Sequence, residues 1–193
     1  MKDKLQFFGV ESREYCPFIR EKSEDLLVKL LKEVKPKKIL EIGTFLGYSA
    51  SIMAEACPEA EIVTLEKSEI NFSDAQKNLQ GYSNIKSLCC DALDYLQNNQ
   101  NVLFDFVFLD GPKGQYYKYL PLLKKMLNVG GVLFADDILF YGLVASNEKI
   151  EHKHRSLVNN LRKFIENLKS DTDFETQIFD FDDGVGIAKK LRW

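Results

Sequence analysis

The sequence lacks a long apolar run. No stretch approaches the roughly 20 residues that a membrane-spanning helix requires, and the N-terminal stretch up to Lys22 is charged throughout, without the apolar centre of a secretory signal. A strong charge of one sign is also lacking. The net charge of −3 argues against a protein whose whole surface binds nucleic acid. We therefore expect a cytoplasmic protein without a membrane segment.

Cysteine is scarce as well. The four cysteines show no Cys-x-x-Cys spacing and no companion histidine cluster, so we expect buried, reduced thiols and no disulfide framework or thiolate metal site. There is no internal repeat, no low-complexity tract and no linker rich in Gly, Ser or Pro. The 193 residues therefore predict one domain, 1–193, with an N-terminal helical segment over 1–35 and an α/β core over 36–193.

Short β-like runs alternate with helical patterns from Pro36 onward. The predicted strands cover 38–42, 61–66, 85–88, 104–110, 132–135, 175–181 and 185–189, and the predicted helices cover 47–57, 70–79, 91–96, 115–127 and 151–168. This alternation predicts a doubly wound, Rossmann-like α/β sheet of seven mostly parallel strands. Asp182-Asp183-Gly184 joins the last two strands, which predicts a hairpin and an antiparallel strand at the C-terminus. Such sheets bind ligands beyond the carboxyl ends of their strands.

The turn after the first predicted strand carries glycines at positions 43 and 47, just before a helix. Glycine lets the backbone turn tightly and approach a ligand, and the amides at a helix start suit the carboxylate of an amino-acid-bearing cofactor. The spacing is GxxxG, not the GxGxxG that places a dinucleotide pyrophosphate, so an NAD-dependent dehydrogenase is disfavoured. Taken alone, the turn is equally compatible with a tight connection that binds nothing.

Two acids follow the next two predicted strands. Glu66 ends the second strand, where a carboxylate can accept hydrogen bonds from both ribose hydroxyls of a nucleoside. Asp91 ends the third, where it could bind an adenine amino group. Either acid alone could be a helix cap or a solvated charge. Together with the glycine turn, the two acids favour a nucleoside cofactor.

Carboxylates also end the fourth and fifth predicted strands, at Asp110 and at Asp136-Asp137. Neighbouring parallel strands would bring them together, and clustered carboxylates need a cation, a shared proton or a basic partner. A hard divalent cation with oxygen ligands is one solution, and capping or ion pairing with lysine is the other. Lys113, one turn after Asp110, is either a surface lysine or a general base for a metal-bound hydroxyl.

Three segments resemble the metal-dependent O-methyltransferase family that includes catechol and caffeoyl-CoA O-methyltransferases. LEIGTFLGYSA is similar to the cofactor loop of that family, FDFVFLDGPKGQYYKY to its Asp-x-x-Lys segment and GGVLFADDILFYGLV to its second metal segment. The resemblance covers about residues 16–190. It implies the seven-stranded methyltransferase sheet, S-adenosylmethionine as the methyl donor and a divalent cation, Mg²⁺ or else Mn²⁺ or Ca²⁺. Members of the family often pair, so a homodimer is implied too.

The same resemblance implies site residues. Lys113 and Asp110 are implied to be catalytic, and Lys113 would take or orient the proton of the acceptor hydroxyl. Asp110, Asp136 and Asp137 are implied to bind the metal. Cofactor contacts are implied for Glu41, Gly43, Thr44, Gly47, Tyr48, Ser49, Glu66, Asp91 and Asp110. The family usually has Asp-Asn where this chain has Asp136-Asp137. The extra carboxylate makes the site more anionic and leaves open whether Asp137 binds the metal directly.

Within the family, KGQYYKYLPLL, DDILFYGLVASNEKIEHKHRSLVNNLRKF and FDDGVGIAKK are most similar to the bacterial tRNA 5-hydroxyuridine methyltransferases. This implies methylation of 5-hydroxyuridine at the wobble position of a tRNA anticodon loop, where the base is unpaired and little unstacking energy is needed. A basic segment could hold the RNA backbone, or could be the solvated face of an amphipathic helix. It comprises Lys149, His152, Lys153, His154, Arg155, Arg162 and Lys163.

Other functions stay open. A catechol presents two adjacent oxygens to a metal, as O4 and O5 of 5-hydroxyuracil do, so small catechols or phenolic and CoA-ester substrates are alternative acceptors. A non-catalytic cofactor- or RNA-binding module is a second alternative. In either enzyme, Phe140-Tyr141-Gly142 is expected to wall the substrate side of the site.

Overall fold

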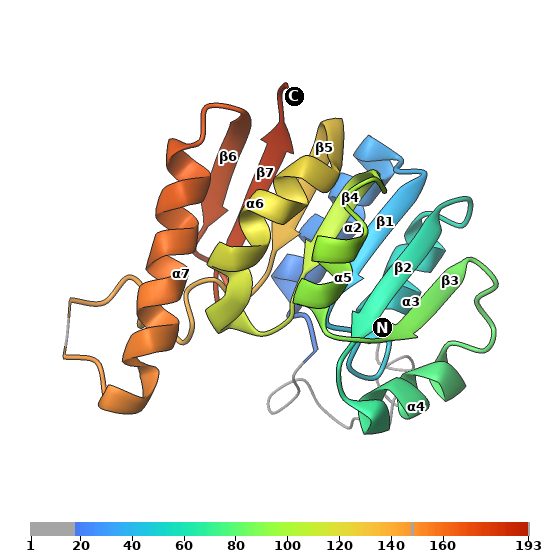
Figure 1. The fold of residues 1–193 in the computed structure, drawn as a ribbon, viewed down its shortest axis with the longest axis horizontal. Helices are drawn as coiled ribbons and strands as arrows, with labels where there is room; N and C mark the ends of the chain where they lie inside the picture. Colours follow the sequence, from blue (N-terminus) through green and yellow to red (C-terminus); the bar gives the residue numbers. More distant parts are fainter. Residues whose placement is uncertain (1–17, 148, 193) are drawn as a thin grey trace.

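Seven strands form one sheet with helices on both faces (Figure 1). The computed structural model describes residues 18–147 and 149–192, so Cys16 and the first part of the predicted N-terminal segment lie outside the described residues. The strands are β1 (Lys38–Ile42), β2 (Glu61–Glu66), β3 (Ile85–Cys89), β4 (Phe104–Leu109), β5 (Leu127–Ala135), β6 (Phe174–Phe179) and β7 (Val185–Lys190). The helices are α2 (Glu21–Val34), α3 (Tyr48–Ala56), α4 (Glu69–Asn78), α5 (Ala92–Asn98), the 3₁₀ helix η2 (Lys113–Gln115), α6 (Tyr116–Met126) and α7 (His152–Ser170).

The strand order is β3-β2-β1-β4-β5-β7-β6. Strands β1 to β5 pair in parallel, whereas β7 is antiparallel to both of its neighbours, β5 and β6. The predicted α/β fold with its antiparallel C-terminal hairpin strand is therefore confirmed. The carboxyl ends of the parallel strands all point to one edge of the sheet, the lower edge in Figure 1. The order reverses between β1 and β4, which is where such sheets bind ligands.

Most predicted boundaries differ from the structure by one or two residues, and the start of β5 differs by more. Helix α6 ends at Met126 and β5 already begins at Leu127, so the fifth predicted strand is longer toward its N-terminal end. Leu127 pairs with Phe104 of β4, and a register shift follows between Phe104 and Phe106. Gly130, at φ 82°, lies in this irregular stretch. Gly130 lies outside the predicted strand 132–135 but inside the observed one, because glycine permits an irregular strand backbone.

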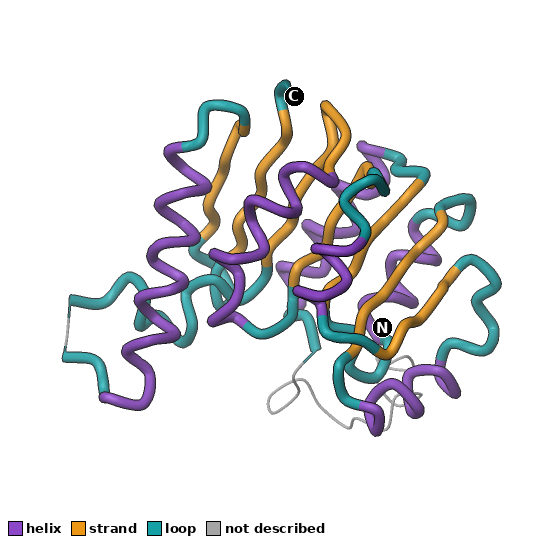
Figure 2. The backbone as a smooth tube through the Cα atoms, in the orientation of Figure 1, coloured by secondary structure: helices purple, strands orange, loops and turns teal. Residues whose placement is uncertain are grey.

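The central strands lie between helices on both sides (Figure 2). Their side chains are buried in two apolar cores, one on each face of the sheet. Val107 and Leu109 of β4 belong to the core covered by α5, α6 and α7, whereas Phe106 and Phe108 belong to the core covered by α2 and α3. Alternate side chains of a strand point to opposite faces, so a strand enclosed on both sides reads as a continuous apolar run. This explains the apolar sequence that predicted β4.

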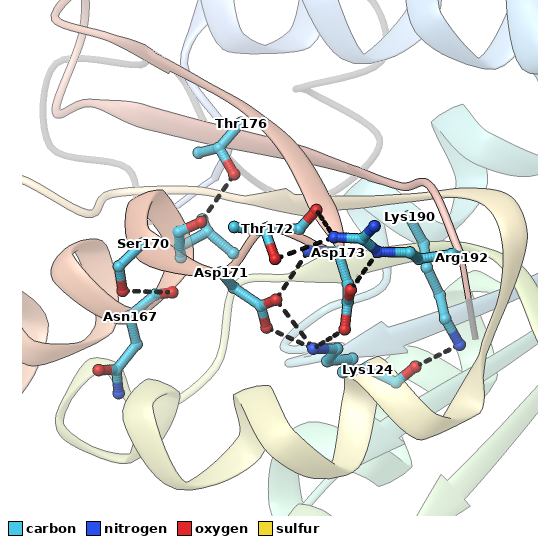
Figure 3. A network of polar contacts seen from close by, with 10 residues as sticks. Lys124, Asn167, Ser170, Asp171, Thr172, Asp173, Thr176, Lys190 and Arg192 are labelled. Carbon is cyan, nitrogen blue, oxygen red and sulfur yellow. Dashed lines mark hydrogen bonds and ion pairs between the residues drawn. The ribbon is translucent and has the colours of Figure 1, made fainter.

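A polar network joins α6 to the end of α7 and to the C-terminal residues (Figure 3). Lys124 Nζ lies 2.6 Å from Asp171 Oδ2 and 2.7 Å from Asp173 Oδ2, and Arg192 Nε lies 2.6 Å from Asp173 Oδ1. Lys190 Nζ donates to the carbonyl oxygen of Lys124 at 2.8 Å. These contacts connect the start of β6 to the helix that leads into β5. Within the described residues, no helix is long and apolar enough to cross a membrane.

Candidate functional site

Two glycines shape the loop between β1 and α3. Gly43 (φ 105°) lies so close to β4 that a Cβ atom there would be 2.4 Å from the carbonyl oxygen of Asp110. Gly47 (φ 91°) is the N-cap of α3, and a Cβ atom there would be 2.8 Å from Cγ of Leu79. Among the described residues, no side chain caps this helix terminus. The positive end of the helix dipole is thereby left to an anionic ligand.

A buried carboxylate lies behind this loop. Glu41 is fully buried, accepts a hydrogen bond from Ser49 Oγ at 2.5 Å, and accepts another from Thr64 Oγ1. Thr44 Oγ1 lies 2.5 Å from Thr64 Oγ1 and extends the network. Burial raises the pKa of Glu41 to about 7, because the ionised form is costly away from water. Glu41 thus supports the loop from the core side.

Glu66 and Asp91, the two acids predicted to bind the nucleoside of the cofactor, have different hydrogen-bond partners. Glu66 accepts the backbone N–H of Phe45 at 2.8 Å through Oε2 and that of Ser68 at 2.8 Å through Oε1. Asp91 is the N-cap of α5 and lies 2.8 Å from Lys67 Nζ. The hydrogen bond from Lys67 holds the pKa of Asp91 below its usual value. The cap expected as the alternative for Asp91 is therefore present, and the same side chain also lines the cavity described below.

Three carboxylates gather at the ends of β4 and β5 around one ammonium group. Lys113 Nζ donates to Asp110 Oδ1 and lies 3.5 Å from Asp137 Oδ2. Asp136 is only 2% exposed, and its Oδ1 accepts the backbone N–H of Asp137 at 2.9 Å. Burial raises the pKa of Asp110 and, still more, that of Asp136. Burial acts against the charge of Lys113, but the neighbouring carboxylates outweigh it and hold the pKa of Lys113 well above its usual value.

The chemistry of these residues suits a divalent cation in part. Asp110 and Asp137 line the cavity, whereas Asp136 does not. Across residues 18–147 and 149–192, no three His, Cys, Asp or Glu side chains are arranged to hold a metal ion. The predicted set of three carboxylates is thus not preassembled. Mg²⁺, however, often takes only one or two carboxylates and completes its shell with water. Asp110 and Asp137 fit such an ion if Lys113 moves from between them.

Tyr116 connects the two strands that carry these carboxylates. Its buried hydroxyl lies 3.1 Å from the carbonyl oxygen of Leu109 and 3.3 Å from that of Asp136. Burial raises the pKa of Tyr116 well above its usual value, so the hydroxyl keeps its proton and donates it to these carbonyls. The sequence did not identify this residue, because an aromatic side chain on an amphipathic helix is usually a core residue.

A cavity of about 480 Å³ opens at the carboxyl ends of the strands. The predicted residues that line it are Gly43, Thr44, Tyr48, Ser49, Glu66, Asp91, Asp110, Lys113 and Asp137. Glu41, Gly47 and Asp136 do not line the cavity. Tyr141, from the segment expected to wall the substrate side, stands at the cavity and is 76% exposed.

Sequence reasoning missed other residues that line the cavity. Phe45 lies within the cofactor loop, so its position alone could have identified it. Tyr119 on α6 ends the segment that resembles the Asp-x-x-Lys segment, but it was not assigned to the site. Arg20 precedes α2, which carries no motif. Only the packing of these elements against the strand ends places them there.

The predicted basic segment is largely engaged within the protein. Arg162 donates from Nε to the carbonyl oxygen of Val144 at 3.0 Å and from Nη2 to that of Ser146 at 2.7 Å. Arg155 donates to a backbone carbonyl just before α7, and Lys153 pairs with a neighbouring glutamate. Among the described residues after position 148, none lines the cavity. Part of the segment therefore stabilises the fold.

A glycine loop after β1 and an acid at the end of β2 line one cavity on a sheet of this topology, an arrangement typical of the class of S-adenosylmethionine-dependent methyltransferases. The family model described as O-methyltransferase matches residues 14–191, and the chain belongs to this family. It is an S-adenosylmethionine-dependent O-methyltransferase of the caffeoyl-CoA type. The predicted family, enzyme class and methyl donor are thereby confirmed.

Individual relatives agree with this assignment. The chain is 32% identical over 175 residues to a caffeoyl-CoA O-methyltransferase from Populus kitakamiensis, which covers 86% of this chain and 74% of the relative. It is 29% identical over 176 residues to a flavonoid 3',5'-methyltransferase from Vitis vinifera, covering 84% and 74%. The crystal structure of an O-methyltransferase from Bacillus cereus in complex with SAH shares the fold, with a TM-score of 0.83, 23% identity and coverage of 98% and 90%.

Proposed function

We propose that this enzyme methylates a hydroxyl of a small phenolic acceptor that carries two neighbouring oxygens, a catechol or a phenolic ester. The observation that carries the proposal is the joint position of Asp110, Asp137 and Lys113 at one wall of the cavity. Such a wall can receive two vicinal oxygens together with a cation. The names of the relatives from Populus and Vitis support a small acceptor over a macromolecular one.

The cofactor is proposed to lie along the other wall. Its amino-acid end meets the N-terminus of α3 at Gly43 and Ser49, where the helix dipole favours a carboxylate. Its ribose hydroxyls donate to Glu66, whose oxygens keep lone pairs beyond the two backbone bonds they already accept. The adenine lies beside Asp91. This arrangement directs the methyl group toward Asp110 and Lys113.

Proton transfer at the acceptor is assigned to Lys113. A divalent cation, Mg²⁺ or else Mn²⁺ or Ca²⁺, bound at Asp110 and Asp137 with Asp136 behind them, would act as a Lewis acid and lower the pKa of the acceptor hydroxyl. In the structure the neighbouring carboxylates keep Lys113 protonated. A cation held by Asp110 and Asp137 would offset their charge and lower the pKa of Lys113, so that Nζ could take or orient the hydroxyl proton. Tyr116 holds the ends of β4 and β5 at a fixed spacing, and the aromatic ring of Tyr141 shields the acceptor from water.

A second candidate acceptor is 5-hydroxyuridine in a tRNA anticodon loop. The observation that favours it is the row of exposed basic side chains at the start of α7, including His152 and Lys153. We also propose that the protein is a homodimer, is cytoplasmic and forms a single domain over residues 1–193. The dimer rests on the family resemblance, and the single domain on the absence of a linker in the sequence.

Methyl transfer from labelled S-adenosylmethionine distinguishes the acceptors. We expect incorporation into a catechol and a caffeoyl ester in the presence of Mg²⁺, with loss of activity on chelation. Full-length tRNA prepared from cells that lack this protein is the competing acceptor. Label on 5-methoxyuridine in the tRNA, without label on either phenol, would reject the small-acceptor proposal and favour the second candidate.

The roles of the site residues are tested by Lys113→Ala and Asp110→Ala. Loss of the general base should lower kcat by about 10²- to 10⁴-fold. Lys125→Ala, on the exposed far end of α6, is the matched control and should keep wild-type turnover. Asp137→Asn should keep the backbone turn, since Asp137 has φ 53° and asparagine tolerates this conformation as well as aspartate does. Unchanged turnover in both alanine variants would refute the assignment.

A further inference from the structure

A chain of four buried oxygen-bearing side chains runs from the core to the cavity. Glu41 accepts hydrogen bonds from Ser49 Oγ and Thr64 Oγ1, and Thr44 Oγ1 lies 2.5 Å from Thr64 Oγ1. Ser49 and Thr44 line the cavity, whereas Glu41 and Thr64 do not. None of the four is more than 8% exposed. A change at Glu41 therefore reaches a ligand through the hydroxyls of Ser49 and Thr44.

The direction of these hydrogen bonds depends on one proton. A hydroxyl donates a single hydrogen, and an ionised carboxylate only accepts. While Glu41 is ionised, Ser49 and Thr64 both donate to it. Thr44 must then donate to Thr64, because the Thr64 hydrogen is already committed. Both hydroxyls that face the cavity consequently offer a ligand only lone pairs.

Protonation of Glu41 reverses one branch of the chain. The carboxylic acid donates its hydrogen either to Ser49 or to Thr64. In the first case Ser49 is free to turn its own hydrogen toward the cavity. In the second case Thr64 donates to Thr44, and Thr44 turns its hydrogen toward the cavity. Either way, one proton on Glu41 supplies one hydrogen-bond donor to the ligand.

We infer that Glu41 is a positioning residue whose proton makes Ser49 or Thr44 a hydrogen-bond donor to the carboxylate of the cofactor. This inference rests on the proposed function, which places the amino-acid end of the cofactor at the N-terminus of α3. An ionised Glu41 removes that donor and adds a negative charge behind the loop. The cofactor therefore binds the protonated form of Glu41 more tightly, and by linkage cofactor binding draws a proton onto Glu41.

The surroundings of Glu41 let this proton respond near neutral pH. Burial raises the pKa of Glu41 to about 7, although the hydrogen bonds from Ser49 and Thr64 act in the opposite direction. The charged groups that act on Glu41 from neighbouring strands are Asp110, after β4, and Glu66, at the end of β2, and both add to the rise. Glu41 is thus mostly protonated at pH 6 and mostly ionised at pH 8.

Calorimetric titration with S-adenosylhomocysteine, which keeps the amino-acid end and lacks the methyl group, tests the inference. With a pKa of about 7, the protonated fraction of Glu41 falls about tenfold between pH 6 and pH 8, so the Kd should rise about tenfold. In Glu41→Gln, whose amide is neutral at both pH values, the Kd should stay within about twofold of the wild-type value at pH 6. Glu61→Gln, an exposed carboxylate on β2, is the matched control and should keep the pH dependence.

Proton uptake supplies a measurement that needs no variant. Titration of the wild-type protein at pH 8 in two buffers of different ionisation enthalpy should show uptake of about one proton per bound S-adenosylhomocysteine. A wild-type Kd that is constant from pH 6 to pH 8, no proton uptake, or an undiminished pH dependence in Glu41→Gln would each overturn the inference. Failure of S-adenosylhomocysteine to bind any form at any pH would instead contradict the proposed cofactor site.

Discussion

Gly43 holds the cofactor loop against the end of β4, in a left-handed conformation and within reach of the Asp110 carbonyl. A side chain there would meet backbone atoms, which cannot turn aside as the end of a flexible side chain can. The glycine thus sets how closely the loop between β1 and α3 approaches the strand that ends at Asp110 and leads to Lys113. The absence of a Cβ atom at Gly43 therefore allows the loop and the end of β4 to lie in close contact.

Gly43→Ala should therefore destabilise the protein by about 2–4 kcal/mol, from backbone strain and overpacking together. Urea unfolding measures the loss, and S-adenosylhomocysteine binding should weaken in parallel. Gly81→Ala is the control, because a Cβ atom at Gly81 would meet nothing within 4 Å. Equal stability of the two variants would show that the close approach to Asp110 does not constrain the loop.

Tyr116→Phe should cost about 1–3 kcal/mol, because the carbonyls of Leu109 and Asp136 lose a buried donor. The loosened strand ends should also raise the KM for the acceptor more than they lower the affinity for S-adenosylhomocysteine. Tyr117→Phe is the control, since the Tyr117 hydroxyl has no hydrogen-bond partner within the described residues. A stability loss without any change in the acceptor KM would assign Tyr116 a purely structural role.

At the scale of elements, α7 supports the segment that follows the carboxylates of β5. Arg162 binds the carbonyls of Val144 and Ser146, and the ring of His154 packs edge-on against Phe140 at 5.4 Å. The segment between β5 and α7 carries Tyr141 to the cavity rim. Basic side chains of α7 thus help to position the segment that carries Tyr141.

Arg162→Ala should release this segment. We expect faster amide hydrogen exchange over residues 143–146 and a stability loss of about 1 kcal/mol, the usual net value of an exposed set of backbone hydrogen bonds. Lys163→Ala, the next residue on α7, should change neither. If transfer to tRNA fell equally in both variants while exchange stayed unchanged, α7 would be a contact surface for RNA.

At the scale of the whole molecule, the network of Lys124, Asp171, Asp173 and Arg192 fastens the C-terminal hairpin to α6 (Figure 3). The hydrogen bond from Lys124, then that from Arg192, lowers the pKa of Asp173 below its ordinary value of 3.8. A carboxyl with a lowered folded pKa adds stability above its ordinary pKa, and this stability is lost as pH falls through the folded value.

Lys124→Met should therefore be less stable than the wild type at pH 6. The difference should shrink as pH falls below 3.8 toward the lowered folded pKa of Asp173, where the Asp173 carboxyl becomes protonated. Urea unfolding at pH 6 and pH 3 measures it. The effect should also weaken at high salt, because the groups are near the surface. Lys125→Met is the control. A difference that is the same at both pH values would mean that Lys124 acts through packing and not through its charge.

Local signals predicted the strands, the helices and the residues at the strand ends. The apolar run of β4 and the glycines at 43 and 47 needed only their neighbours in sequence, because strand burial and tight turns leave local patterns. The start of β5 was misplaced, because its first residue pairs with Phe104 across an irregular register that no local pattern records. Tyr116 and Tyr119 were missed because helix periodicity predicts which side chains are buried, but not which residues or cavity they contact.

The sequence by itself determined the sheet, the glycine turn after β1 and the family, since each depends on the order of residue types along the chain. Only the tertiary structure decided which carboxylates face the cavity and which lie behind it. Lys113 contacts Asp137, and Glu41 contacts Thr64, although the two residues of each pair lie too far apart in sequence for a local pattern to predict the contact. Burial and charge act through space, so the protonation of such groups is set by neighbours brought together by the fold.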